Sequence, residues 1–318
     1  MAAPGRIMST VPIAGHASFG EMVGVAIAIS FLSAATLVVG NRAPNSTPAN
    51  VDVSQSNGGA TRVSVTTSGN ETLGALLFTP PGTGPFPAIL LNHGSGRTRE
   101  QLARLGPYER TAEGQGPVFV RHGYVLLYIF RHGVGLSADV GQSAVDLMEA
   151  QMSANGQHAR NVLQLQLLEG REMADAEAGV AFLRRRPEVD PARIAVVGHS
   201  FGGSLTVLMT ERDATLRAAV VFSLAGYSWD NSPELRERLL GAVRRSKTPL
   251  FFIHAANDYS TNSGRVLDAE LVRLGKPHRL AIYPAVGQTP DDGHDFPNNS
   301  VPVWEHDVFE FLNSYTRR

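Results

Sequence analysis

The stretch IAVVGHSFGGS at residues 194–204 decides the fold, because an apolar strand in it runs into a Gly-x-Ser-x-Gly turn and continues as a helix. A serine hydroxyl is a weak nucleophile, so a catalytic serine must be held clear of its own backbone, with room for a base and an acyl group. A sharp turn between a strand and a helix does this, and small residues two positions before and after the serine relieve the crowding. The pattern therefore favours Ser200 as a nucleophile over a serine in a purely structural turn.

Composition restricts the class of protein. The 318 residues are 43% hydrophobic, enough for one large α/β core or two smaller ones, and one catalytic domain behind a leader is the simpler arrangement. The formal net charge of −1 gives no overall field that would attract nucleic acid or anionic lipid. We therefore expect a small, roughly neutral molecule as partner and no nucleic acid. The absence of cysteine excludes disulfides, thiolate metal sites and thiol nucleophiles.

The amino-terminal segment differs from the rest of the chain. Residues 22–40 (MVGVAIAISFLSAATLVVG) are apolar and long enough for the core of an export signal or for one membrane span. The segment that follows is rich in Asn, Ser, Pro and Gly and cannot bury enough apolar surface to fold. We therefore predict a leader at 1–48, a linker at 49–60 and a catalytic domain at 61–318. An exported protein, periplasmic or extracellular, or one tethered to a membrane through 22–40, is expected, with a cytoplasmic protein as the alternative.

Beyond residue 60, strand-like and helix-like segments alternate. The apolar patterns predict strands at 62–67, 72–78, 87–92, 124–130, 193–197, 216–224, 249–255 and 279–283, the first two joined as an antiparallel hairpin. Helical patterns occupy 157–185, 233–245, 263–274 and 303–316. Strands separated by helices predict an α/β fold: a mostly parallel, twisted sheet of about eight strands with helices on both faces.

A nucleophilic serine needs a base, and the base needs an acid that orients it. Ligands of parallel sheets bind at the carboxyl ends of the strands, and in this architecture the chain order is serine, acid, histidine. Asp258 follows the strand at 249–255, at the correct end of the sheet. His294 lies after the last strand, next to a glycine and polar residues that predict an exposed, mobile loop. We therefore predict a catalytic triad of Ser200, Asp258 and His294.

Other residues compete for these roles. Asp230 also follows a strand and is the reserve candidate for the acid. His254 lies inside a strand, where an imidazole is more often a hydrogen-bonded core residue. His199 occupies the variable position of the Gly-x-Ser-x-Gly turn, and we expect it to pack beneath that turn.

An oxyanion hole needs two backbone donors. One is expected to be the N–H of Phe201, directly after the nucleophile. The other is expected from the loop after the strand at 87–92, with the N–H of Ser95 favoured and that of Gly94 next. Residues 131–137 (RHGVGLS) follow the next strand and are predicted to buttress this site.

Substrate-binding residues are placed by position alone. Tyr227 and Trp229 lie between two strands at the active-site end of the sheet and are predicted to line an acyl pocket. Residues 138–160, with Met148 and Met152, are a candidate lid. The segment 225–246, which holds Tyr227 and Trp229, and the segment 138–160 could equally be ordinary helices that cover the sheet.

No cofactor or metal is predicted. The sequence has no His-Glu-x-x-His pair, no P-loop lysine and no Gly-x-Gly-x-x-Gly between a strand and a helix.

The motifs together resemble those of an α/β-hydrolase, most similar to the branch of dienelactone hydrolases and prolyl oligopeptidase-like proteins. The resemblance covers residues from about 60 to 318 and rests on NHGSG at 92–96, RHGVGLS at 131–137, VVGHSFGGS at 196–204, FFIHAANDYST at 251–261 and DDGHDF at 291–296. Dienelactone hydrolases resemble this pattern with cysteine as nucleophile. Serine at position 200 therefore favours a general carboxylic ester, or a lactone, over dienelactone itself.

The sequence thus favours a serine esterase that works through an acyl-enzyme intermediate and needs no cofactor. Three alternatives stay open on the same residues: an acyltransferase, a small peptidase, and a non-catalytic binding module of the same fold. The large amino-terminal propeller of oligopeptidases is missing, which weighs against peptide substrates.

Overall fold

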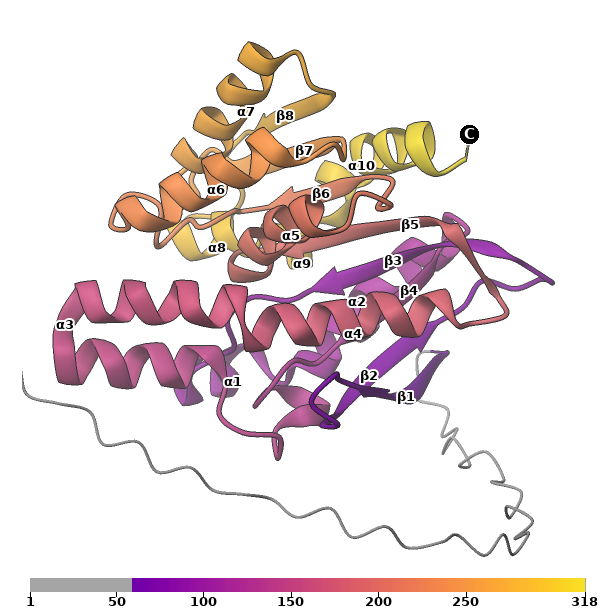
Figure 1. Ribbon diagram of the computed structural model, residues 1–318, viewed down its shortest axis with the longest axis horizontal. Coiled ribbons are helices and arrows are strands. Elements are labelled where there is room, and N and C mark those ends of the chain that lie inside the picture. Colours follow the sequence, from indigo (N-terminus) through magenta and orange to yellow (C-terminus); the bar gives the residue numbers. More distant parts are fainter. Residues whose placement is uncertain (1–58, 318) are drawn as a thin grey trace, which may run out of the picture. The chain divides into compact units, whose positions relative to one another are not determined.

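The fold is built on one eight-stranded sheet with the strand order β1-β2-β4-β3-β5-β6-β7-β8 (Figure 1). The computed structural model describes residues 59–317. The strands are β1 (Ala60–Thr66), β2 (Thr72–Phe78), β3 (Phe86–Asn92), β4 (Val125–Ile129), β5 (Val189–His199), β6 (Ala219–Phe222), β7 (Leu250–Ala255) and β8 (His278–Tyr283). The pairs β1/β2 and β2/β4 are antiparallel, and the other five pairs are parallel. The predicted α/β sheet of about eight mostly parallel strands is confirmed.

Helices cover both faces of this sheet. They are α1 (Arg99–Leu105), α2 (Tyr108–Arg121), α3 (Ala144–Glu169), α4 (Arg171–Arg184), α5 (Phe201–Arg212), α6 (Pro233–Arg245), α7 (Asn262–Leu274), α8 (Pro290–His294), α9 (Phe296–Asn299) and α10 (Val301–Thr316). One apolar core lies between the sheet and helices α3 to α7. A second core lies on the opposite face, under α2 and α10. Parallel strands covered on both faces explain why their sequences are apolar without alternation.

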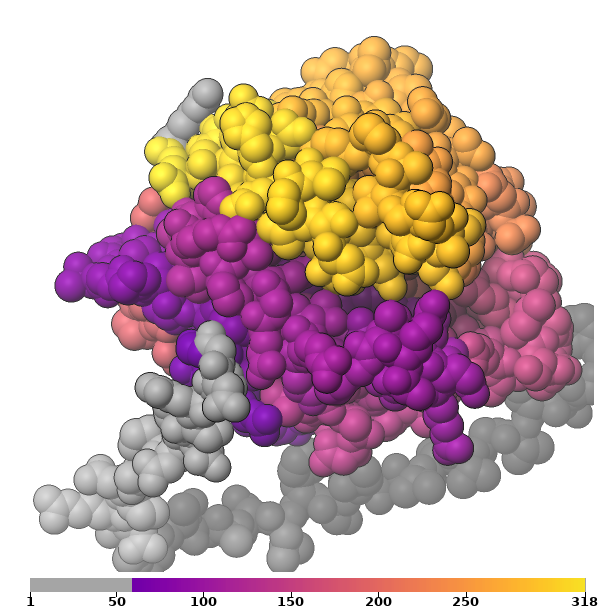
Figure 2. Space-filling view, turned by 180° about the vertical axis from the view of Figure 1, so that it is seen from behind, coloured from indigo at the N-terminus to yellow at the C-terminus, as the bar shows by residue number. Residues whose placement is uncertain are grey.

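The second face joins distant parts of the chain. Figure 2 shows this side of the molecule, where the yellow carboxyl-terminal helices lie beside the segment that holds α2. Arg121 of α2 pairs with Glu305 of α10, and the ring of His122 stacks on that of Phe309 at 3.6 Å between centroids. The carboxyl-terminal helix is therefore anchored to the first half of the domain.

Two helices between β3 and β4 were not predicted. Helix α2 contains Pro117 and two glycines, residue types that lower helix propensity and hide its pattern. Gly116 is required by packing, because a Cβ atom at this position would lie 2.3 Å from the ring of Phe78. Close contact between α2 and β2 thus takes precedence over local propensity here.

The helical region before β5 also differs from the prediction. The predicted continuous helix at 157–185 is broken at Gly170, where α3 ends and α4 begins. Helix α3 itself contains Gly156 in a non-helical conformation (φ 80°, ψ −177°), and the chain folds back there into two helical arms (Figure 1). The candidate lid at 138–160 therefore covers the first arm of a helical hairpin, the turn that precedes it and the start of the second arm.

The amino-terminal prediction lies mostly outside the described residues. The leader at 1–48, its apolar segment 22–40 and most of the linker at 49–60 fall there, and their role stays a prediction. At the boundary, Ala60 already belongs to β1, so the folded domain begins one residue earlier than predicted. Within residues 59–317, none of the helices combines the length and the apolar character needed to cross a bilayer.

Candidate active site

Ser200 sits at a strained turn between β5 and α5. Its backbone has φ 57° and ψ −117°, a conformation that non-glycine residues rarely adopt. The turn is possible because the residues two positions before and after Ser200 are glycines. A Cβ atom on Gly202 would lie 2.2 Å from the carbonyl oxygens of Asn92 and His93, and one on Gly198 would lie 2.3 Å from Thr206 Oγ1. The glycines thus let β3, β5 and α5 approach closely around the half-buried Ser200 hydroxyl group.

The three predicted triad residues form one continuous chain of hydrogen bonds. His294 Nε2 lies 2.9 Å from Ser200 Oγ, and His294 Nδ1 lies 2.7 Å from Asp258 Oδ1. An ionised carboxylate only accepts hydrogen bonds, so the proton of the neutral imidazole is on Nδ1. Nε2 is then free to accept the proton of the serine hydroxyl, as a general base must.

Asp258 is buried and held in its ionised form. Burial by itself raises the pKa of this carboxyl group, but hydrogen bonds from His254 and His294 outweigh it and lower the pKa to about 2. The backbone N–H of Tyr259 donates to Oδ1 as well, at 2.8 Å. The reserve acid, Asp230, instead accepts a hydrogen bond from Asn262 at the surface, and no contact joins it to His294.

His294 is not on an exposed loop, as the sequence predicted. It ends the short helix α8 and is 4% exposed. Its backbone carbonyl accepts two hydrogen bonds, from Ser223 Oγ at 2.8 Å and from His199 Nε2 at 2.9 Å. Gly293 allows α8 to pack on the chain after β7, because a Cβ atom there would lie 2.6 Å from Asn257. His294 is therefore held in place by the last residue of β5 and by the chain that follows β6 and β7.

His199 was expected to pack beneath the turn, and this prediction is wrong. The side chain lines the pocket, with its ring 5.0 Å from that of His294. Burial, together with the proximity of His294, lowers the pKa of His199 to about 4, so its ring is neutral at pH 7 and can donate through Nε2. The sequence did hold a signal for this position. His199 is the last residue of β5, directly before the serine, so it lies at the carboxyl end of the strand, where the pocket forms.

The loop after β3 is clamped by a buried arginine. Arg131 follows β4, is fully buried, and donates through Nη2 to the carbonyl oxygens of His93 and Gly94, both at 2.7 Å. In a trans peptide the carbonyl and the following N–H point in opposite directions, so the N–H groups of Gly94 and Ser95 point away from Arg131. Gly94, Ser95 and Phe201 all line the pocket beside Ser200. Residues 131–137 thus support the loop after β3, as predicted, and they do so mainly through the guanidinium group of Arg131.

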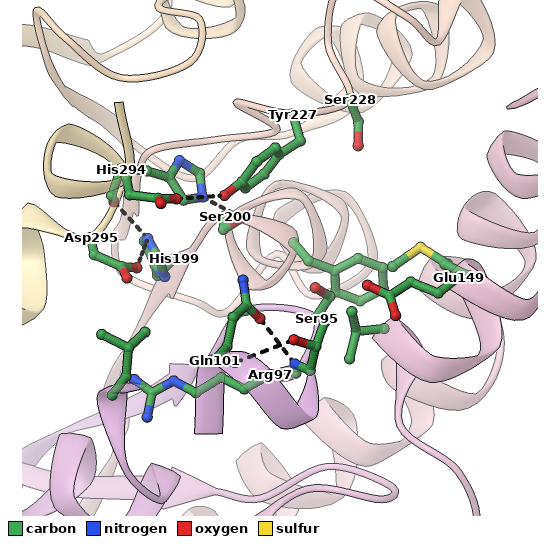
Figure 3. A pocket seen from close by; sticks show the side chains of 18 of the residues that line it. Ser95, Arg97, Gln101, Glu149, His199, Ser200, Tyr227, Ser228, His294 and Asp295 are labelled. Atoms are coloured by element: carbon green, nitrogen blue, oxygen red, sulfur yellow. Dashed lines mark hydrogen bonds and ion pairs between the residues drawn. The ribbon is translucent and has the colours of Figure 1, made fainter. Parts of the chain in front are cut away.

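The serine opens into one pocket of about 320 Å³ (Figure 3). In Figure 3, the side chains of Ser200 and His294 point toward each other at its wall, with Tyr227 beside them. Tyr227 lines the pocket, with its ring 4.9 Å from that of His294, and its predicted role toward the acyl group stays a prediction. Trp229 does not line the pocket. It is 2% exposed and packs in the core under α3 to α7, because the turn after Ala225 directs it inward.

Both arms of the α3 hairpin form one wall of the pocket. Met148 and Met152 come from the first arm, and Arg160 and Gln164 come from the second. Arg160 donates to Gln164 Oε1 and Ser228 Oγ, which joins the hairpin to the chain after β6. The candidate lid therefore forms part of a wall of this pocket, and whether it moves as a lid stays a prediction.

Possible metal ligands within residues 59–317 lie elsewhere, on α10. His306, Asp307 and Glu310 place their ligand atoms within 4.8 Å of one another. Arg279 pairs with both carboxylates of this group, at 2.7 and 2.8 Å. Both carboxylates of this group are therefore already paired with an arginine at the surface.

Fold and site together define a class. A mostly parallel sheet of eight strands, with a strained serine after β5, an aspartate after β7 and a histidine after β8, is the α/β-hydrolase fold. The chain belongs to the dienelactone hydrolase family, whose family model matches residues 118–307. Among curated protein sequences, none matches the chain.

Solved structures share the fold at low sequence identity. Pyrococcus horikoshii acylaminoacyl peptidase is similar with a TM-score of 0.56 and 17% identity, over 81% of this chain and 42% of that protein. The chain therefore spans less than half the length of that peptidase. A putative dienelactone hydrolase from Klebsiella pneumoniae has a TM-score of 0.54 and 16% identity, over 81% of this chain and 98% of that one. A Pyrococcus furiosus esterase has a TM-score of 0.53 and 18% identity, over 87% and 95%.

Proposed function

We propose that this protein is a serine hydrolase that cleaves carboxylic esters or lactones through an acyl-enzyme intermediate. The observation that carries the proposal is the continuous chain Ser200 Oγ, His294 and Asp258, with contacts of 2.9 and 2.7 Å, at the wall of the pocket. A nucleophile, a base within hydrogen-bond reach and an acid that orients the base are the groups that acyl transfer requires.

The reaction follows from these positions. His294 takes the proton of Ser200 while the serine oxygen attacks the ester carbonyl carbon, and Asp258 stabilises the imidazolium that forms. The carbonyl oxygen becomes negative and is stabilised by the N–H groups of Phe201 and Ser95, with Gly94 as a further donor. His294 then protonates the departing alkoxide, which leaves Ser200 acylated. Water attacks the acyl-enzyme with His294 as base, and the acid product leaves.

The pocket walls indicate where the two parts of the substrate lie. Met148 and Met152 present an apolar surface on the hairpin, which suits the hydrocarbon part of an acyl group. Tyr227 stands next to His294 and is exposed at the pocket mouth, which suits contact with the alcohol part. A small ester is the proposed partner, and no cofactor has a part in these steps.

The direct test is labelling with a fluorophosphonate probe. We expect the wild-type protein to be labelled at Ser200, and the Ser200→Ala and His294→Asn variants to be unlabelled or labelled far more slowly. If the correctly folded wild-type protein does not react with the probe, the proposed hydrolase is wrong, and the non-catalytic binding module is the alternative that stays. Hydrolysis of p-nitrophenyl esters, compared with p-nitroanilides, then separates an esterase from a peptidase. Product analysis with competing alcohols separates hydrolysis from acyl transfer.

The acyl pocket is tested by a chain-length series. Met148→Trp fills the wall of the hairpin, so we expect the preferred p-nitrophenyl ester to become shorter. Trp229→Phe is the control, because this side chain is buried outside the pocket and its replacement leaves the preference unchanged. The same preference in both variants would remove Met148 from the acyl site.

A further inference from the structure

The carboxylate of Asp258 has a second histidine on its other oxygen. His254 Nδ1 lies 2.9 Å from Oδ2, whereas His294 Nδ1 lies 2.7 Å from Oδ1. The side chains of His254 and Asp258 are both completely buried. Two imidazole groups therefore share one carboxylate, one at the pocket and one in the core behind it.

The direction of this second hydrogen bond is fixed by its partners. The ionised carboxylate of Asp258 can only accept, so His254 donates through Nδ1–H. On the other side of the ring, Nε2 lies 3.4 Å from Ser263 Oγ. The Ser263 hydroxyl group itself donates to the carbonyl oxygen of Leu224, at 2.5 Å. His254 is thus hydrogen-bonded to Asp258, which follows β7, and its Nε2 side lies against Ser263 of α7.

The fold leaves a space for this ring. Helix α7 passes His254 at Gly264, where a Cβ atom would lie 2.7 Å from His254 Nε2 and 2.8 Å from Cδ2. Leu280 of β8 lies next to the same place. A buried histidine surrounded this closely has one orientation, and that orientation directs Nδ1 at Asp258.

We propose that His254 is a positioning residue for the catalytic acid. It holds Oδ2 of Asp258 so that Oδ1 stays aligned with His294, and it supplies the hydrogen bond that a buried carboxylate oxygen needs. The inference rests on the proposed function, because it gives Asp258 a catalytic role. It assigns His254, whose position inside a strand suggested only a core residue, to the support of the active site.

The electrostatic effect has a defined direction. Without the donor on Oδ2, negative charge concentrates on Oδ1, which still receives hydrogen bonds from Tyr259 N–H and from His294. Oδ1 is then a stronger hydrogen-bond acceptor for His294 Nδ1–H. The other titratable groups that face His294 are His199, Tyr227 and Tyr259, with ring centroids 5.0, 4.9 and 5.4 Å away, and Asp258 is the one that faces His254.

The test compares His254→Leu with His254→Asn in the full chain. Leucine removes the donor, whereas the amide nitrogen of asparagine can take the place of Nδ1. For the leucine variant we expect kcat to fall about tenfold with KM unchanged, and the acidic limb of the kcat/KM profile to move to higher pH by about half a unit. We expect His254→Asn to restore both. Ile253→Val is the control for a general change in β7, with a wild-type profile.

A second variant keeps the test decisive if leucine prevents folding. In His254→Gln the amide reaches the position of Nε2 and not that of Nδ1, so we expect the same losses as for leucine. A folded leucine or glutamine variant with the wild-type pH profile would overturn the proposal, and so would an asparagine variant as impaired as leucine.

Proton NMR reads the same arrangement without substrate. The Nδ1–H groups of His254 and His294 both bind a carboxylate, so we expect two low-field resonances in the wild-type protein and one in His254→Asn. A single low-field resonance in the wild type would overturn the proposal. The protein could also show two resonances but neither hydrolyse esters nor react with a fluorophosphonate. The two hydrogen bonds would then be present, and the proposed function would be wrong.

Discussion

At the scale of single residues, the site depends on places where a side chain is missing. Gly226 lies against the acid and the base: a Cβ atom on it would be 2.8 Å from Asp258 Oδ1 and 2.9 Å from His294 Nδ1. These distances are shorter than real Cβ contacts allow, so an added methyl group must move one of the two side chains. Spacing in the sequence gave no sign of this, because Gly226 follows β6, far along the chain from both partners.

Gly226→Ala is expected to lower kcat by at least about tenfold, because a small displacement of a catalytic pair costs one to two orders of magnitude in rate. Ester hydrolysis under saturating substrate measures this, together with the rate of fluorophosphonate labelling. Gly114→Ala is the matched control. This residue is exposed within α2 and has no atom within 4 Å of its Cβ position, so the variant keeps full activity and is stabilised by up to about 1 kcal/mol. Equal activity of the two variants would contradict the packing argument.

At the scale of elements, the loop after β3 and the strand β4 are joined by Arg131. Its Nη2 binds two successive carbonyl oxygens of the loop, and its Nε binds Glu172 of α4 at 2.7 Å. A planar guanidinium group can make these contacts at once, whereas a lysine ammonium group is a single point charge. The strand β4 and helix α4 thus set the direction of the N–H groups that are proposed to stabilise the oxyanion.

Arg131→Lys is expected to lower kcat about tenfold while KM changes little, because a misdirected oxyanion donor weakens binding of the transition state and not of the substrate. Steady-state kinetics on a p-nitrophenyl ester separate the two constants. Arg171→Lys serves as the control, since Arg171 binds the other oxygen of the same Glu172 but does not touch the loop. If Arg131→Lys raised KM alone, the loop would be part of substrate binding and not of the oxyanion hole.

The hairpin of α3 is the second element that shapes the site. Its reversal depends on Gly156, whose φ of 80° and ψ of −177° belong to a region that other residues avoid. Gly156→Ala is expected to shift the two arms, and with them Met148 and Arg160, so that KM rises several-fold while kcat stays near the wild-type value. The exposed Ser153→Ala on the same hairpin is the control. An unchanged KM for Gly156→Ala would show that the tip of the hairpin does not influence the pocket.

At the scale of the whole molecule, buried ionisable groups link stability to pH. Burial, helped by Arg131, lowers the pKa of His93, and burial with His294 lowers the pKa of His199 to about 4. Below about pH 6.5 both rings take up protons in the unfolded chain before they do so in the folded protein, and for His199 this difference extends to about pH 4. The folded state therefore loses stability as the pH falls through this window. The pKa of Asp258, lowered to about 2, adds a later loss between about pH 4 and 2.

We therefore expect the free energy of unfolding in urea to be constant above about pH 7 and to fall steadily from about pH 6.5 downward. His199→Gln removes one of the two neutral imidazoles, so its curve is flatter between pH 6.5 and 4 than that of the wild type. A wild-type curve that stays level down to pH 5 would show that these histidines accept protons in the folded state without cost.

Local pattern in the sequence determined the sheet, the turn that carries Ser200 and the order of Ser200, Asp258 and His294. Apolar runs, glycine spacing and chain order can be read from the sequence itself, without knowing how the elements pack. Only the tertiary structure decided that Trp229 faces the core, that His199 lines the pocket, and that His254 contacts Asp258 and Arg131 contacts the loop after β3. Each of these depends on where a side chain from one element meets another element, and that meeting is set by packing between segments distant in the chain.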